Sequence, residues 1–214
     1  MSADAAGFEA ARAASVRRGR LLEYLTIGWN SLEAVISIGA GLTAGSIALV
    51  GFGFDSLIEV SSGAALLWRL HMDAPERRER AERIALRLVG VSFLLLAAYV
   101  GFDSVKSLVR REAPESSYVG IAVAALSLAV MPLLARAKRR VAAEISSRAL
   151  HADSRQTDIC TYLSAILLAG LILNALLGWW WADPVAALVM IPIIVKEGVE
   201  GLRGETCCDD GACH

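Results

Sequence analysis

Apolar stretches long enough to cross a membrane recur along this chain. Each holds about 20 residues, which as an α-helix spans the ~30 Å hydrocarbon core of a bilayer. The sequence of 214 residues is 56% hydrophobic, and its charges gather between the apolar stretches. Because helices satisfy their own backbone hydrogen bonds in lipid, the pattern predicts an all-α membrane protein built as a six-helix bundle. We expect the spans near residues 22–43, 46–68, 84–108, 117–135, 156–179 and 182–202.

The basic residues indicate how the chain is oriented. Cytoplasmic connections of membrane proteins are enriched in Lys and Arg. With a cytoplasmic N-terminus, all but three of the 21 Lys and Arg lie on the inner side, and the exceptions are Lys106, Arg110 and Arg111. We therefore expect both termini in the cytoplasm of a multi-pass protein in a bacterial-type plasma membrane. The net charge of -1 leaves no dominant cationic surface, which argues against a nucleic-acid binder.

Three regions are expected along the chain. Residues 1–20 carry several arginines and no compact apolar core, so they do not form a signal peptide. They form either a cytoplasmic amphipathic helix at the membrane surface or a frayed tail. Residues 21–203 form the six-helix transport domain, and residues 204–214 form a cytoplasmic tail rich in Cys and His.

Carboxylates stand inside the apolar stretches. Asp55 and Glu59 lie four positions apart in the second stretch, so they share one helix face, and no Lys or Arg lies within a helical turn of them. Each charge buried in a bilayer costs roughly 2.5 kcal/mol or more. Two adjacent carboxylates repel at low dielectric, and a divalent cation relieves the repulsion, in competition with protons. The pair therefore predicts a cation or proton pathway, whereas Asp103 has Lys106 one turn away, which predicts a local ion pair.

The fifth span supplies the expected other half of this site. Asp158 opens its apolar run, and Ser154 lies one turn earlier on the same helix face. Carboxylate and hydroxyl oxygens suit hard divalent cations, whereas zinc usually gains a His or Cys ligand. The predicted metal ligands are Asp55, Glu59, Asp158 and Ser154.

Four further polar residues are candidate accessory ligands. Asp153 lies about 140° around the helix from Asp158, which makes it a poorer partner. His151 is either an entry ligand or an ordinary interfacial histidine. In the first span, Asn30 accompanies Glu33, which either completes the cluster, carries a proton or makes a hydrogen bond between helices.

The last ten residues, ETCCDDGACH, gather thiols and an imidazole, groups that suit zinc or copper(I). We expect either metal capture at the inner mouth or a tail whose thiols stay reduced in the cytoplasm. The residues concerned are Cys207, Cys208, Cys213 and His214.

Three stretches together resemble the transmembrane domain of the cation diffusion facilitators. They are GSIALVGFGFDSLIEV with its Asp55–Glu59 pair, the ADSRQTD lead-in to the fifth span, and WADPVAALV with Asp183. The resemblance covers most of residues 22–203. It implies six helices with cytoplasmic termini, a metal site shared by helices two and five, and proton exchange.

Two departures from that family matter. Its usual helix-five pattern is HxxxD, in which Asp158 matches the Asp and Ser154 stands at the His, so the identity of the metal is in doubt. The cytoplasmic domain that normally follows helix six is also missing, so we expect a short form. The homodimer that this domain supports in the family is then expected to form through the membrane helices.

These features together predict a secondary transporter that exports a divalent metal cation from the cytoplasm in exchange for protons. Zinc is the expected substrate, with manganese, iron and cobalt as alternatives, and no prosthetic group is expected. The expected partners are divalent cations, protons, membrane lipid and a second copy of the chain. The alternative is a metal sensor or scaffold without net transport, because binding and transport use the same ligands. An enzyme is not expected, since the sequence has no HExxH motif and no nucleophile elbow.

Overall fold

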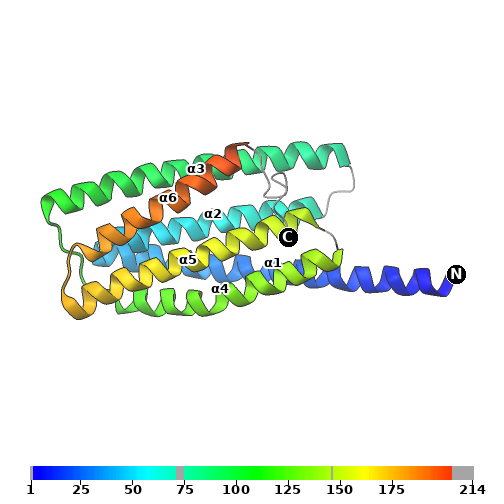
Figure 1. The fold of residues 1–214 in the computed structure, drawn as a ribbon, viewed down its shortest axis with the longest axis horizontal. Helices are drawn as coiled ribbons and strands as arrows, with labels where there is room; N and C mark the ends of the chain where they lie inside the picture. The colour runs from blue at the N-terminus through cyan, green and yellow to red at the C-terminus, as the bar shows by residue number, and fades with distance from the viewer. Residues whose placement is uncertain (1, 71–74, 146, 204–214) are drawn as a thin grey trace.

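The computed structural model of the chain describes residues 2–70, 75–145 and 147–203, and these ranges fold into six α-helices without a strand (Figure 1). The predicted all-α bundle is therefore confirmed. The helices are α1 (Ser2–Ala44), α2 (Ile47–Leu70), α3 (Pro75–Arg110), α4 (Tyr118–Ile145), α5 (Arg148–Leu177) and α6 (Ala182–Arg203). The start of α1 and the end of α6 lie toward the same end of the bundle (Figure 1).

Helix ends follow from local residue chemistry. Serine side chains accept hydrogen bonds from backbone N–H groups three residues on and so cap α2, α4 and α5. The pairs are Ser46–Leu49 at 3.2 Å, Ser117–Gly120 at 3.1 Å and Ser147–Leu150 at 3.3 Å. Gly45 after α1 and Gly178 after α5 have φ values of 67° and 64°, a conformation that favours glycine.

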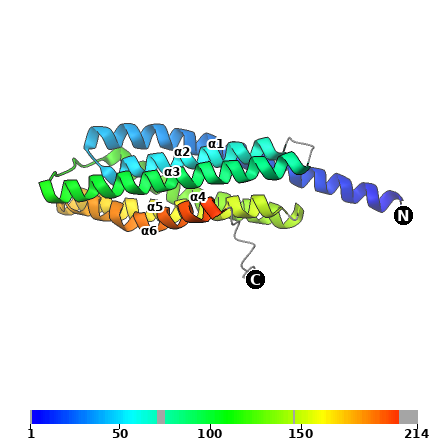
Figure 2. The ribbon, with the colours of Figure 1, turned by 90° about the horizontal axis from the view of Figure 1, so that it is seen from above.

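The helices form two layers. In Figure 2, α1, α2 and α3 make one layer, and α4, α5 and α6 make the other. The principal contacts between layers join α1 to α4, α2 to α5 and α3 to α6. Because α2 also contacts α1, α3 and α6, it is the most central helix of the bundle.

Glycines allow several helices to approach to backbone contact. A Cβ atom added at Gly90 of α3 would lie 2.7 Å from the carbonyl oxygen of Gly198 in α6. One added at Gly170 of α5 would lie 2.6 Å from Cβ of Ala186 in α6. Small residues at such crossings are typical of membrane helices, where close van der Waals packing stabilises association.

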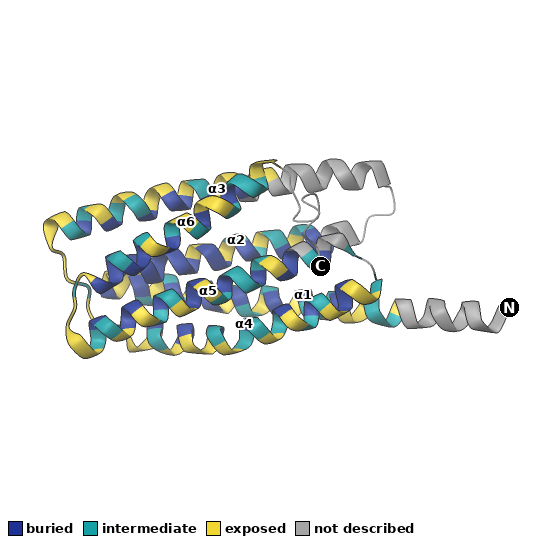
Figure 3. Ribbon diagram, in the orientation of Figure 1, coloured by how far each residue is buried: buried dark blue, intermediate teal, exposed yellow. Residues whose placement is uncertain are grey.

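Many large apolar side chains are exposed on the outer surface of the bundle, whose exposed positions are yellow in Figure 3. Large side chains such as Phe102, Val109 and Leu176 are 73%, 77% and 78% exposed. Four helices contain a stretch long and apolar enough to cross a membrane: Ile47–Leu67, Gly90–Arg110, Tyr118–Ile145 and Asp153–Leu177. An exposed apolar surface around such helices identifies an integral membrane protein.

The first and last helices, α1 and α6, are not among these four. Along α1, polar side chains recur at helical spacing on the buried face, and they are Glu23, Thr26, Asn30, Glu33 and Ser37. They lower the hydropathy of the helix without facing the outside. Helix α6 carries Asp183, Lys196 and Glu197 in and beside its apolar run, and both helices pack within the bundle.

Some boundaries differ from those expected. Residues 2–20 are continuous with the first expected span, since α1 runs without a break to Ala44. Helix α4 continues to Ile145, well beyond the expected end of its span at residue 135, and carries Lys138 with it. The tail ligands Cys207, Cys208, Cys213 and His214 lie outside the described residues.

Candidate metal-binding site

Asp55 and Glu59 lie one turn apart on the buried face of α2, where they are 5% and 3% exposed. Among the described residues, no Lys, Arg or His forms an ion pair with either carboxylate. One oxygen of Glu59, Oε2, also has no hydrogen-bond partner there. Two buried acids without a direct ion-pair partner favour binding of a cation.

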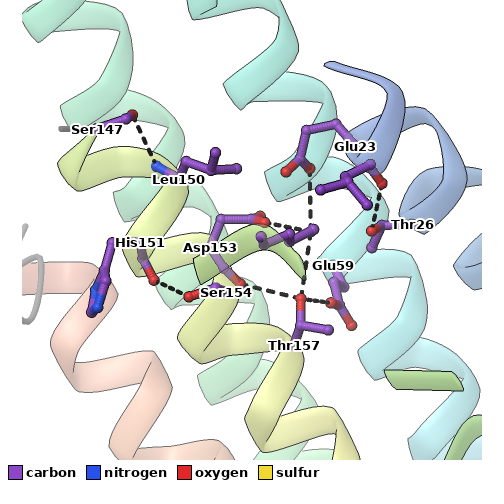
Figure 4. A network of polar contacts seen from close by, with 11 residues as sticks. Glu23, Thr26, Glu59, Ser147, Leu150, His151, Asp153, Ser154 and Thr157 are labelled. Atoms are coloured by element: carbon purple, nitrogen blue, oxygen red, sulfur yellow. Dashed lines mark hydrogen bonds and ion pairs between the residues drawn. The ribbon is translucent and has the colours of Figure 1, made fainter. Parts of the chain in front are cut away.

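Helix α5 faces this pair with Thr157. The Thr157 hydroxyl donates a hydrogen bond to Oε1 of Glu59 at 3.0 Å (Figure 4). One turn further along the same buried stripe, the Cys160 thiol lies beside Glu59 and is 1% exposed. The α5 face toward the acid pair therefore carries Asp153, Thr157 and Cys160.

The two α5 residues that the resemblance assigns to the metal lie elsewhere. Asp158 is only partly buried and forms an ion pair with Arg139 of α4, with a second bond from Nη2 at 3.3 Å. The Ser154 hydroxyl is buried but donates to the carbonyl oxygen of His151 on its own helix at 2.6 Å. Successive side chains of a helix point about 100° apart. Because Thr157 faces Glu59 of α2, the next residue, Asp158, points instead toward α4. The structure thus does not bring Asp158 or the Ser154 hydroxyl to Glu59.

A buried lysine lies next to the acid pair, and the sequence pattern did not single it out. Lys138 of α4 is 0% exposed and forms ion pairs with Asp153 of α5 and with Glu23 of α1, the latter at 3.3 Å. Its Nζ also lies 3.5 Å from the Thr157 hydroxyl oxygen, and that hydroxyl contacts Glu59. Asp153 is therefore a partner of Lys138 in this structure.

The accessory residues of α1 lie on the buried side of the bundle. Glu33 accepts hydrogen bonds from the Ser127 hydroxyl of α4 at 3.2 and 3.0 Å. Asn30 is 0% exposed, and neither polar atom of its amide has a hydrogen-bond partner in the described part of the chain. Leaving such a group unpaired costs about 1–3 kcal/mol, so a partner for this amide would be stabilising. The Oδ1 atom is free to accept and the Nδ2 atom is free to donate.

His151 lies near the beginning of α5. Its ring points away from Glu59 and Thr157, and its Nδ1 atom has no hydrogen-bond partner among the described residues (Figure 4). The side chain is partly buried. This placement leaves the two alternatives for His151, entry ligand or interfacial residue, both open.

The polar residues lie between two apolar clusters. The larger cluster includes Phe52 of α2, Met131 of α4 and Leu163 of α5. The smaller one, which we call the inner cluster, consists of Leu66, Val141, Ala142 and Leu150, with Leu22 and Ile145 packed against it. On α2, α4 and α5 alike, the polar positions fall between the residues of these two clusters, so apolar side chains bound the polar layer on both sides.

No ready-made cage of protein ligands is present in the described ranges. There, no three side chains of His, Cys, Asp or Glu are placed to hold a metal ion together. The arrangement that comes nearest is the Asp55–Glu59 pair with the Thr157 hydroxyl. Such an arrangement binds a cation that keeps part of its water shell or whose remaining ligands move in.

Asp183 has a structural role that its motif did not reveal. Its carboxylate accepts hydrogen bonds from the Ser46 hydroxyl and from the backbone N–H groups of Ile47 at 2.9 Å and Ala48 at 3.4 Å. Asp183 therefore caps the N-terminus of α2 from the start of α6. A carboxylate at a helix N-terminus also interacts favourably with the helix dipole.

Comparison with known proteins places these features in a family. Residues 24–204 match the family model of the cation efflux transmembrane domain. An uncharacterized transporter of Synechocystis sp. is 27% identical over 183 residues, which cover 81% of this chain and 58% of that protein. Transmembrane protein 163 of Xenopus laevis is 25% identical over 180 residues, which cover 84% of this chain and 64% of that protein.

A third relative is an uncharacterized transporter of Methanocaldococcus jannaschii, 25% identical over 179 residues, which cover 80% of this chain and 63% of that protein. The matched region thus spans 58% to 64% of the length of these three relatives. The family match itself extends over most of the chain and includes the Asp55–Glu59 pair. The chain therefore belongs to the cation efflux family, a family of membrane cation transporters.

Proposed function

We propose that the protein exports a divalent metal cation, with zinc as the first candidate, from the cytoplasm in exchange for protons. The observation that carries this proposal is the buried Asp55–Glu59 pair, which has no ion-pair partner among the described residues. Membership of the cation efflux family supports transport of a cation. The metal, the proton exchange and the direction are part of the proposal.

The proposed binding site uses the carboxylates of Asp55 and Glu59 and the hydroxyl of Thr157. Thr157 takes the place that sequence reasoning gave to Ser154 and Asp158, because its hydroxyl already contacts Glu59. Glu33 and Cys160 lie close enough to interact electrostatically with the pair. Their carboxylate and thiol are therefore additional candidate ligands for the metal. A thiol beside two carboxylates favours a borderline cation such as zinc over magnesium or calcium.

Proton exchange follows from the same oxygens. A carboxylate binds a metal only when it is deprotonated, so metal and protons compete for Asp55 and Glu59. A cation arriving from the cytoplasm displaces protons, and protons arriving from the outer side release the cation. Metal and protons thereby move in opposite directions through one site.

Access to the site requires the helices to move. The inner cluster around Leu66, Val141 and Leu150 packs α2, α4 and α5 together on one side of the polar layer. A cation entering from that side therefore needs these three helices to separate there, which is the movement expected of alternating access. The protein in its membrane, as a homodimer formed through the helices, is the proposed working unit.

The experiment is metal flux into liposomes that contain the purified full chain, with an imposed pH gradient. Zinc, manganese, iron and cobalt are each supplied outside, and an indicator inside reports metal while a pH dye reports protons. Metal flux that follows the pH gradient, with opposite movement of protons, supports the exporter. If metal binds but none of the four ions is transported, the protein is instead the alternative, a metal sensor or scaffold. Absence of both overturns the proposal.

A further inference from the structure

Lys138 is the most completely buried basic residue whose contacts the structure describes. Its side chain is 0% exposed, and its ammonium contacts acids on two other helices, Glu23 of α1 and Asp153 of α5. An ammonium group removed from water is strongly destabilising unless acidic partners surround it. Lys138 is thus held within the bundle by carboxylates from the neighbouring helix α5 and from the sequence-distant helix α1.

The surrounding acids outnumber this lysine. Glu23, Asp153 and Glu59 all act on Lys138, and Thr157 connects its Nζ to Glu59 through contacts of 3.5 and 3.0 Å. Two of these acids keep an oxygen without a hydrogen-bond partner in the described part of the chain, namely Oε1 of Glu23 and Oε2 of Glu59. These two buried carboxylate oxygens are therefore available to bind a further cation.

We propose that Lys138 is a resident cation that excludes the transported ion from Asp153 and Glu23. These two carboxylates adjoin the Asp55–Glu59 pair on the side of the inner cluster. Without the ammonium, they would form a second binding site for a divalent cation next to the first. Lys138 thus limits the number of bound cations and keeps them from settling beside the transport site. This inference rests on the proposed function in treating Asp55 and Glu59 as that site.

The distinction from a merely structural ion pair lies in what its removal creates. A structural pair, once broken, lowers stability and creates no affinity for metal. A resident cation, once removed, leaves two buried carboxylates that attract a divalent ion, because the electrostatic repulsion between Lys138 and that ion is gone. Stoichiometry of metal binding therefore separates the two roles.

The test is equilibrium binding of manganese and of zinc to the purified full chain in detergent, measured by titration calorimetry. The variant Lys138→Met should bind about one more divalent cation per chain than the unaltered protein. Adding Asp153→Asn to it should abolish the extra binding, because that change removes one of the two freed carboxylates. Lys106→Met is the matched control, since Lys106 also pairs with an acid but lies on α3. Tail thiols are common to all of these chains, so differences between variants exclude their contribution.

Flux measured in parallel keeps the two proposals separate. The Lys138→Met chain should carry metal at least about tenfold more slowly, because a cation held at the second site must leave before the next turnover. Lys138→Arg, which restores the positive charge, should restore the original stoichiometry. If the unaltered chain transports metal and Lys138→Met binds no additional ion, the resident-cation role is overturned while transport stands. If no chain transports metal but Lys138→Met gains a bound ion, the role of Lys138 stands and the proposed function fails.

Folding of the Lys138→Met chain is checked by its elution as a single species in detergent. If that chain aggregates, Lys138→Gln carries the test, because glutamine also removes the positive charge but can still hydrogen-bond to Asp153. One additional divalent cation bound per chain in Lys138→Gln supports the inference. Unchanged stoichiometry in a folded Lys138→Gln chain overturns it.

Discussion

The hydroxyl of Thr157 donates to Oε1 of Glu59 across the interface between α5 and α2 at 3.0 Å. The helix-five face that meets the acid pair is therefore the face of Thr157. Asp158, one position later, pairs with Arg139 on α4. The expected HxxxD register at Ser154 and Asp158 is thus displaced by one residue from the face that the structure directs toward α2.

Histidine placed at residue 157 should raise the preference for zinc. Thr157→His adds a nitrogen ligand beside Glu59, and nitrogen ligands favour zinc over manganese. Ser154→His is the matched control, because the Ser154 hydroxyl is directed to the carbonyl of His151. Competition binding between zinc and manganese measures the preference. A larger zinc preference in Ser154→His than in Thr157→His would restore the register inferred from the resemblance.

Loss of the Asp158 carboxylate should have a small effect. The ion pair between Asp158 and Arg139 is partly exposed, with side chains 26% and 38% accessible, and such pairs contribute about 1 kcal/mol or less. Asp158→Asn should therefore leave metal affinity within about twofold and change stability only slightly. Titration calorimetry and thermal unfolding in detergent measure the two quantities. A complete loss of metal binding in this variant would make Asp158 a ligand after all.

Removal of the Asp183 carboxylate should destabilise the bundle. Asp183→Ala deletes the acceptor for the Ser46 hydroxyl and for the N–H groups of Ile47 and Ala48. Loss of a helix cap typically costs about 1–2 kcal/mol, so the free energy of unfolding should fall by about 2 kcal/mol. Asp183→Asn keeps one acceptor oxygen and should lose less. Equal stability of Asp183→Ala and the unaltered chain would contradict the capping role.

Alanine at Gly90 should separate α3 from α6. Its Cβ would lie 2.7 Å from both the carbonyl oxygen of Gly198 and the backbone nitrogen of Leu202, so the helices must move apart. Overpacking of this kind costs about 1–3 kcal/mol. Gly28→Ala is the control, because no atom lies within 4 Å of the added Cβ. That change should be neutral or stabilise by up to about 1 kcal/mol through helix propensity. Thermal unfolding of the two variants measures the difference, and equal midpoints would refute the close crossing.

Features that act over a few residues are readable from the sequence. The apolar stretches mark the helices of the bundle, and the predicted ion pair between Asp103 and Lys106 is confirmed at 3.4 Å. Serine caps and the turn glycines Gly45 and Gly178 act within one turn of their helices. These caps, turns and ion pairs join residues a few positions apart, so the residue types that form them can be recognised in the sequence.

Features that depend on distant partners were not readable. Whether Thr157 or Asp158 faces the acid pair depends on how α5 is rotated about its axis relative to α2. Side chains at adjacent positions point about 100° apart, so a small error in that rotation selects the wrong residue. The sequence pattern places Lys138 among the cytoplasmic cations, but α4 extends past it, and Glu23 and Asp153 pair with it inside the bundle. Asp183 stood out only as part of a motif, because its partners on α2 lie more than 100 positions away.

Transport depends above all on the Asp55–Glu59 pair of α2, which we propose binds the transported cation. The most direct test is metal flux driven by a pH gradient in liposomes with Asp55→Asn, compared with Asp103→Asn. Both changes remove a carboxylate from an apolar helix, but Asp103 is already paired with Lys106. We expect Asp55→Asn to remain folded and to lose at least about tenfold in flux, which corresponds to about 1.4 kcal/mol in the barrier, while Asp103→Asn keeps its flux. Undiminished flux in a folded Asp55→Asn protein would show that this pair does not bind the transported cation.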